Sequence, residues 1–74
     1  MDQDLARVSS LFESIFLERG DIIHGGLSVT EDHENKVNEA LVLVTKPHLV
    51  NLEACRCLIP LLISWKGEIN IRKM

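Results

Sequence analysis

Aromatic side chains are scarce in this chain of 74 residues, which has no tyrosine, two phenylalanines and one tryptophan. Because 46% of its residues are nevertheless hydrophobic, its core has to be built mainly from leucine, isoleucine and valine. Cysteine is also rare, and the single pair Cys55 and Cys57 does not provide the disulfide framework of small secreted domains. We therefore expect an intracellular, cytoplasmic protein with reduced thiols.

Charge of one sign is not concentrated anywhere in the sequence. The formal net charge is −3, and the eight lysines and arginines are dispersed apart from a small cluster at the C-terminus. The chain therefore lacks a basic patch for a phosphate backbone, and we do not expect nucleic acid to be its main partner. The polar and acidic N-terminal residues 1–10 also lack the features of a targeting segment.

A long hydrophobic run is missing as well. The most apolar stretch, Leu49–Trp65, is shorter than the ~20 residues that a membrane span requires. It is also interrupted by Asn51, Glu53 and Arg56. We therefore expect no membrane span.

The chain is short enough to form a single domain, residues 1–74. A domain of this size buries only ~60% of the surface that its unfolded chain exposes, so its stability is small. Small size combined with a high aliphatic content indicates that part of the apolar surface is completed by another chain.

The segment Leu49–Trp65 is hydrophobic around nearly the whole circumference of a helix. Its main polar residues share one strip roughly 80° wide: Glu53, Arg56 and Ser64. Pro60 falls in the middle of this strip, so we predict a buried central helix that is kinked at Pro60, with the proline on the solvent side. The alternative is a helix that ends near Ile59, followed by a short helix or strand from Leu61.

A first helix is predicted from Asp2 to Arg19, because apolar residues recur there at the three-four spacing. They are Leu5, Val8, Leu11, Phe12, Ile15 and Phe16. Gly20 follows in the usual place for a left-handed residue at the end of a helix. Residues 20–30 then form the connecting loop.

A second helix is predicted from Ser28, which forms a capping box with Glu31, and Thr30 is an alternative cap. Its hydrophobic seam consists of Val37, Ala40, Leu41 and Val44. Residues 40–44 could instead form a buried strand, but no helix-breaking residue precedes them and we favour the helix. Val42 and Leu43 then point away from the seam.

Residues 68–72 alternate between polar and apolar as in a strand, after a stop at Lys66-Gly67. They predict a short extended tail, or a small β-hairpin with residues 62–65. The predicted fold class is therefore mainly α: a compact domain of three to four helices with a kinked central C-terminal helix and an extended tail. The residues expected in the core include Phe12, Ile15, Leu41, Leu52 and Leu58.

Residues capable of chemistry are present, but their spacing does not favour it. Cys55 and Cys57 would point to nearly opposite sides of a helix, and His48 lies roughly 10 Å along the axis from Cys55, too far to share a metal. His24 and His33 are isolated from one another, and no glycine motif for phosphate is present. We expect no catalytic residue, no metal site and no cofactor, and therefore no enzyme.

By elimination, the sequence favours a non-catalytic protein-interaction module, a small subunit or regulator that acts as an oligomer or with a partner protein. The expected partner-binding residues are hydrophobic ones that neighbouring helices cannot cover: Val42, Leu43, Leu58, Leu61, Leu62 and Trp65. The alternatives are a nucleic-acid-associated regulator and a metal or redox protein that uses Cys55 and Cys57.

Overall fold

The structure, a computed structural model, describes residues 3–26 and 28–73, of residue 73 only the backbone. These residues form four helices, listed here in chain order: α1 (Gln3–Ile23), α2 (Glu31–Val44), α3 (Pro47–Val50) and α4 (Glu53–Lys73). The predicted mainly helical class is confirmed. The described residues contain no strand, so the possible β-hairpin is not found among them.

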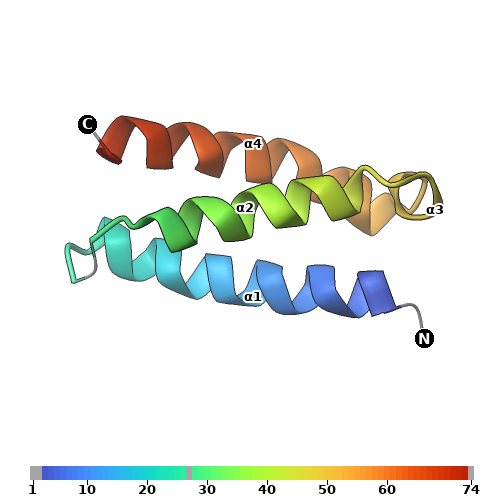
Figure 1. Cartoon of the computed structure of the whole chain (residues 1–74), viewed down its shortest axis with the longest axis horizontal. Coiled ribbons are helices and arrows are strands. Elements are labelled where there is room, and N and C mark those ends of the chain that lie inside the picture. Colours follow the sequence, from blue (N-terminus) through green and yellow to red (C-terminus); the bar gives the residue numbers. More distant parts are fainter. Residues whose placement is uncertain (1–2, 27, 74) are drawn as a thin grey trace.

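The helices form a small bundle in which α2 lies between α1 and α4 (Figure 1). The chain reverses direction at the turn after α1 and again at α3, so α1 and α4 run parallel to one another and antiparallel to α2. The central helix is therefore α2, and the prediction that the C-terminal helix is central is wrong. The physical reason is that α2 turns small and β-branched side chains inward, with Val37 1% exposed and Ala40 and Val44 0% exposed, so a helix can approach on either side.

Helix α1 buries one face at the predicted spacing: Val8, Leu11 and Ile15. Leu5 and Phe12 pack against this core and are partly buried. Phe16 was expected on the same face but is 57% exposed, because it lies beyond the arc that α2 and α4 cover.

The end of α1 is later than predicted. Gly20 lies inside the helix, and the left-handed residue is Gly25, with a φ of 80°. The Gly25 N–H donates to the Ile22 carbonyl at 3.0 Å. The Gly26 N–H donates to the Asp21 carbonyl, also at 3.0 Å, and the two bonds together form a Schellman motif. A glycine costs a helix only about 1 kcal/mol relative to alanine, so Gly20 alone does not end α1.

Helix α2 includes residues 40–44, as predicted, and Leu43 is 8% exposed. The prediction that Leu43 points away from the core is therefore wrong. Because α2 packs against α1 on one side and α4 on the other, its buried arc is wider than a single seam and includes Leu43.

The predicted third helix is divided in two. Pro47 opens the short helix α3, and residues 51 and 52 separate α3 from α4. Leu49 in α3 is 1% exposed, whereas Leu52 in the break is 43% exposed, so the placement of Leu52 in the core is wrong.

Helix α4 is continuous through Pro60 and through Gly67, and ends at Lys73. The alternative of two segments divided near Ile59 is therefore wrong, and so is the extended tail at residues 68–72. The tail is helical because Ile69, 8% exposed, continues the spacing of the buried residues Leu62 and Trp65. Pro60 lies on the exposed side, as predicted, and the kink there remains a prediction.

Helices α1 and α4 contact one another through long side chains, and their backbones do not pack closely together. The Phe12 ring stacks on Trp65 with 5.4 Å between centroids, and the Arg19 guanidinium lies 5.6 Å from the centre of the Trp65 ring. Trp65 is 6% exposed and Leu62 is 0% exposed, so the prediction that these two residues remain uncovered is wrong. Trp65 is covered from α1, which the sequence pattern of the C-terminal segment alone could not reveal.

Leu62→Ala is expected to lower the free energy of unfolding by ~2–5 kcal/mol, because it leaves a cavity in a packed core. Its neighbour Leu61 is 45% exposed and provides the matched control, with an expected loss below ~1 kcal/mol for Leu61→Ala. Urea denaturation followed by circular dichroism measures both values. Equal losses in the two variants would contradict the orientation of α4.

Candidate partner-binding surface

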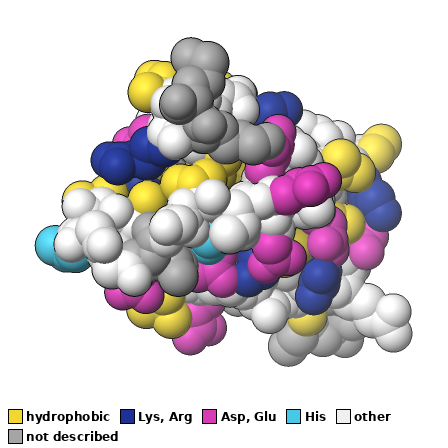
Figure 2. Space-filling view, turned by 60° about the vertical axis from the view of Figure 1, so that its left-hand side comes forward, with side chains coloured by type: hydrophobic (Ala, Val, Ile, Leu, Met, Phe, Trp, Pro, Cys, Tyr) yellow, Lys and Arg dark blue, Asp and Glu magenta, His cyan; other side chains and the backbone are white. Residues whose placement is uncertain are grey.

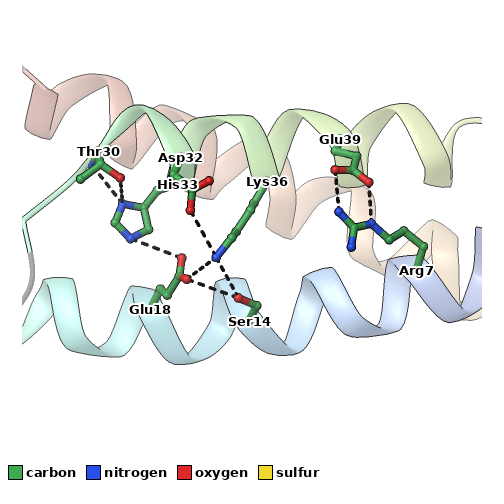
Figure 3. Close-up of polar contacts among 8 residues, drawn as sticks. All are labelled: Arg7, Ser14, Glu18, Thr30, Asp32, His33, Lys36 and Glu39. Atoms are coloured by element: carbon green, nitrogen blue, oxygen red, sulfur yellow. Dashed lines mark hydrogen bonds and ion pairs between the residues drawn. The ribbon is translucent and has the colours of Figure 1, made fainter.

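A polar cluster lies between the C-terminal half of α1 and the N-terminal half of α2 (Figure 3). Lys36 Nζ donates to a carboxylate oxygen of Glu18 and, at 3.1 Å, to Ser14 Oγ. It also lies 3.5 Å from an Asp32 oxygen. The hydrogen bond to Glu18 raises the pKa of Lys36 above its ordinary value, so the amine is charged at neutral pH.

His33 belongs to the same cluster and is 8% exposed. Its Nδ1 accepts a hydrogen bond from the Thr30 N–H at 2.9 Å, which caps the start of α2. Because Nδ1 is the acceptor, the proton of the neutral ring is assigned to Nε2. His33 Nε2 lies 3.3 Å from Glu18 Oε2. The two groups are not aligned for a hydrogen bond, so this buried carboxylate oxygen accepts none.

The arrangement of this cluster is structural. Both ring nitrogens of His33 face groups of the protein itself, one in the helix cap and the other at Glu18. The adjoining hollow, lined in part by Ile15, Val29 and Trp65, measures about 30 Å³, room for one or two water molecules. Small-molecule sites usually occupy ~300–1,000 Å³, so this hollow is much smaller than such a site.

Sequence reasoning missed this cluster. The predicted cap paired Ser28 with Glu31, whereas the observed cap pairs Thr30 with His33. The Thr30 alternative was available from the sequence, but a histidine at the third helical position is not the usual capping-box residue. The contact with Glu18 depends on the register between α1 and α2, which the turn after α1 determines.

The cysteines lie in different environments. Cys55 is 1% exposed in the core, and Cys57 is exposed on the opposite side of α4. Within residues 3–26 and 28–73, no group of three or more His, Cys, Asp and Glu side chains could hold a metal ion. Nor does any helix of this described part combine the length and hydropathy needed to cross a membrane.

The six predicted partner-binding residues do not form one surface. Leu43, Leu62 and Trp65 are buried within the chain, and Leu58 is partly buried against the core. Leu61 is 45% exposed and Val42 is 62% exposed. Val42 follows the inward-facing Ala40 by two residues, roughly 200° around α2, so it points away from both α1 and α4 and cannot share a patch with Leu61.

A continuous exposed surface runs along α4 on the side away from α1 and α2. We define the outer face of α4 by seven exposed uncharged residues that lie together on this side of the helix: Cys57, Pro60, Leu61, Ile63, Ser64, Gly67 and Ile71. On a helical projection they span an arc of roughly 160°. From Cys57 to Ile71 the one charged side chain within this arc is Glu68, which accepts two hydrogen bonds of 3.1 Å from Arg19.

The outer face of α4 differs from the exposed side of α2. Ile63 is 58% exposed and Ile71 is 73% exposed, and neither was predicted as a contact residue. On α2, by contrast, every fully exposed residue except Val42 is charged or polar. The sequence contained the signal for Ile63 and Ile71, but assigning residues 68–72 to a strand placed Ile71 off the helix.

Comparison of the chain with protein-family models, with curated proteins and with solved structures gives no match in any of the three. The function therefore has to be inferred from the surface and its charges.

The pair Arg7–Glu39, which joins α1 to α2 through two hydrogen bonds of 2.6 and 3.0 Å, predicts a dependence of stability on pH (Figure 3). The hydrogen bond from Arg7 holds the pKa of Glu39 below its ordinary value. This stabilisation is present above the ordinary pKa of glutamate and is lost as the pH falls through the lowered one. We expect Glu39→Gln to be less stable than the parent at neutral pH, and the difference to shrink toward about pH 3.

Urea denaturation of both proteins at several pH values measures this difference. A difference that stays constant over the whole range would contradict the ion pair. Added salt should also reduce the difference at neutral pH, because the pair is exposed to solvent.

Proposed function

We propose that the chain is a non-catalytic interaction domain that binds a protein partner through the outer face of α4. The observation that carries this proposal is the exposure of large aliphatic side chains on a helix face with almost no charge: Leu61 at 45%, Ile63 at 58% and Ile71 at 73%. Contiguous apolar patches are uncommon on monomeric proteins unless they bind something.

The length of the surface supports the same proposal. Cys57 and Ile71 are 14 residues apart, roughly 21 Å along the helix axis, which matches three to four turns of a partner helix. The polar residues of the face, Ser64 and Gly67, are small and do not interrupt it. Such a surface resembles those that bind amphipathic helices, where anchors recur at three-four spacing.

The composition of the remaining surface argues against catalysis as the main activity. Glu18 of α1 contacts both His33 and Lys36 of α2, and His33 also caps α2. A proton-transferring group needs free access to a substrate in a pocket, and the hollow beside these residues has room for only one or two water molecules.

Ile63→Glu is expected to abolish partner binding without unfolding the protein, because the side chain is 58% exposed. Val42→Glu is the matched control, since Val42 is also a β-branched residue in a helix and is 62% exposed. A photo-crosslinking residue introduced at position 63 or 42, followed by mass spectrometry of the cell extract, identifies any partner. Light scattering of the purified protein measures self-association.

The expected result is a defined adduct from position 63 but not from position 42, and its loss in a chain that also carries Leu61→Glu. If position 42 gives the same adducts as position 63, or if neither gives a defined adduct and the protein is a strict monomer, the proposal is wrong.

A second test uses the two glycines that lie inside helices. A Cβ added at Gly20 or at Gly67 meets nothing within 4 Å, so alanine fits at both sites. Each substitution should raise the free energy of unfolding by about 0.5–1 kcal/mol, because glycine is a poor helix former. Gly67→Ala should nevertheless weaken partner binding, since the glycine permits close approach of a second helix, whereas Gly20→Ala should leave binding unchanged. Equal binding by both variants would show that Gly67 is not in the contact.

A further inference from the structure

The cations of the chain are divided into two groups by their pairing. All four that precede α3 lie in ion pairs within the molecule: Arg7 with Glu39, Arg19 with Glu68, Lys36 with Glu18, and Lys46 with Asp4. Three cations of α4 form no ion pair with any described residue: Arg56, Lys66 and Arg72.

These three cations surround the outer face of α4. Around the helix axis, Arg56 and Lys66 lie to one side of Pro60 and Ile71, and Arg72 lies to the other side. Along the axis, Arg56 and Arg72 are roughly 24 Å apart, slightly more than the length of the outer face. The unpaired positive charges therefore border the apolar strip at both ends and on both sides.

The charge distribution of the whole chain is asymmetric in the same sense. Residues 1–46 carry nine Asp and Glu and four Lys and Arg, a sum of −5, whereas residues 47–74 carry two and four, a sum of +2. The two sums give the net charge of −3. Acidic side chains are spread over the surface of α1 and α2 at the end of the bundle where α4 terminates (Figure 2).

We infer that the partner presents an acidic amphipathic helix, docked along the outer face of α4. This inference rests on the proposed function and adds the chemistry of the partner. Apolar side chains of the partner, at three-four spacing, cover Pro60, Ile63 and Ile71, and its flanking carboxylates meet the three unpaired cations. The open position at Gly67 allows the two helix backbones to approach to the ~8 Å end of the usual range.

A shallow hollow at the N-terminal end of α4 extends this surface. It is lined by Glu53, Arg56 and Cys57.

Other occupants fit the charges less well. A second copy of the chain, packed α4 against α4, brings three more unpaired cations to the interface. The α4 of that copy offers one unpaired acid, Glu53, in return, so like charges would meet. A nucleic acid has phosphates for the cations but no apolar side chains at helical spacing to cover Ile63 and Ile71. An anionic membrane is attracted only weakly by three cations spread over roughly 24 Å.

The probe for this inference is a synthetic amphipathic helix of 21 residues, about 30 Å long, with leucine at three-four spacing and glutamate on its flanks. Two matched peptides carry glutamine or lysine in place of glutamate. We expect the intact protein to bind the glutamate peptide about tenfold more tightly than the glutamine peptide, with an advantage that falls as salt rises. Fluorescence of labelled peptides measures all three affinities.

Charge reversal provides the decisive comparison. The triple variant Arg56→Glu, Lys66→Glu and Arg72→Glu should prefer the lysine peptide over the glutamate peptide, because none of the three side chains supports the fold through an ion pair. Circular dichroism checks that the variant is folded. If the parent binds the glutamate and glutamine peptides equally, or if the variant keeps the preference of the parent, the inference is wrong.

Two further measurements separate this inference from the proposed function. Anionic vesicles of phosphatidylserine and a mixed oligonucleotide are tested in parallel with the glutamate peptide. If the protein binds either of them more tightly than the peptide, and the triple variant loses that binding, the partner is not an acidic helix. If the protein binds the glutamate and glutamine peptides equally but position 63 still gives a defined adduct in the cell extract, only the acidic chemistry of the partner is wrong. If positions 63 and 42 give the same adducts, the proposed function itself is wrong.

Discussion

The structure depends on how closely two helices can approach α2 at the same time. Ala40 in the second half of α2 and Val44 at its last position are both 0% exposed, and their small size lets α1 and α4 pack closely against α2 from two sides. A larger residue at Ala40 would push one helix away and open the contact between Phe12 and Trp65. The bundle is therefore organised by the least hydrophobic of its three long helices, not by the most hydrophobic one.

Ion pairs add direction to this packing. Arg7–Glu39, Glu18–Lys36 and Asp4–Lys46 join α1 to α2 and to the residues that follow α2, and together they extend along α1 from Asp4 to Glu18. Pairs exposed to solvent contribute little stability, but they disfavour a register in which like charges meet. These pairs and Arg19–Glu68 engage every lysine and arginine of α1 and α2, so the unpaired cations among the described residues all lie in α4.

The sequence was sufficient for the local structure where periodicity is strong. The helix from Gln3, the helical state of residues 40–44, the exposed Pro60 and the exposed Leu61 all followed from spacing and from the position of proline.

It was insufficient wherever a contact from a distant element decided the outcome. Trp65 and Leu62 looked uncovered because the pattern of one helix does not show that Phe12 of another will cover Trp65. Ile71 was assigned to a strand because polar and apolar residues alternate over five positions. The same five residues also fit a helix that is apolar on two sides, so this short pattern could not distinguish the two. The outer face of α4 could be recognised only once Ile69 was known to be core and Ile71 its exposed neighbour two residues on.

The order of the helices also bears on how the chain reaches this structure. Each of the main packed pairs, α1 with α2 and α2 with α4, joins helices that follow one another closely along the chain. Folding therefore requires the closure of short loops, and bundles of this low contact order fold in microseconds to milliseconds. The contact between α1 and α4 through Phe12 and Trp65 joins residues far apart in the sequence, and from its loop-closure entropy we expect it to form late. A domain assembled in this way presents a formed surface before any partner arrives, so association does not have to supply the entropy of folding.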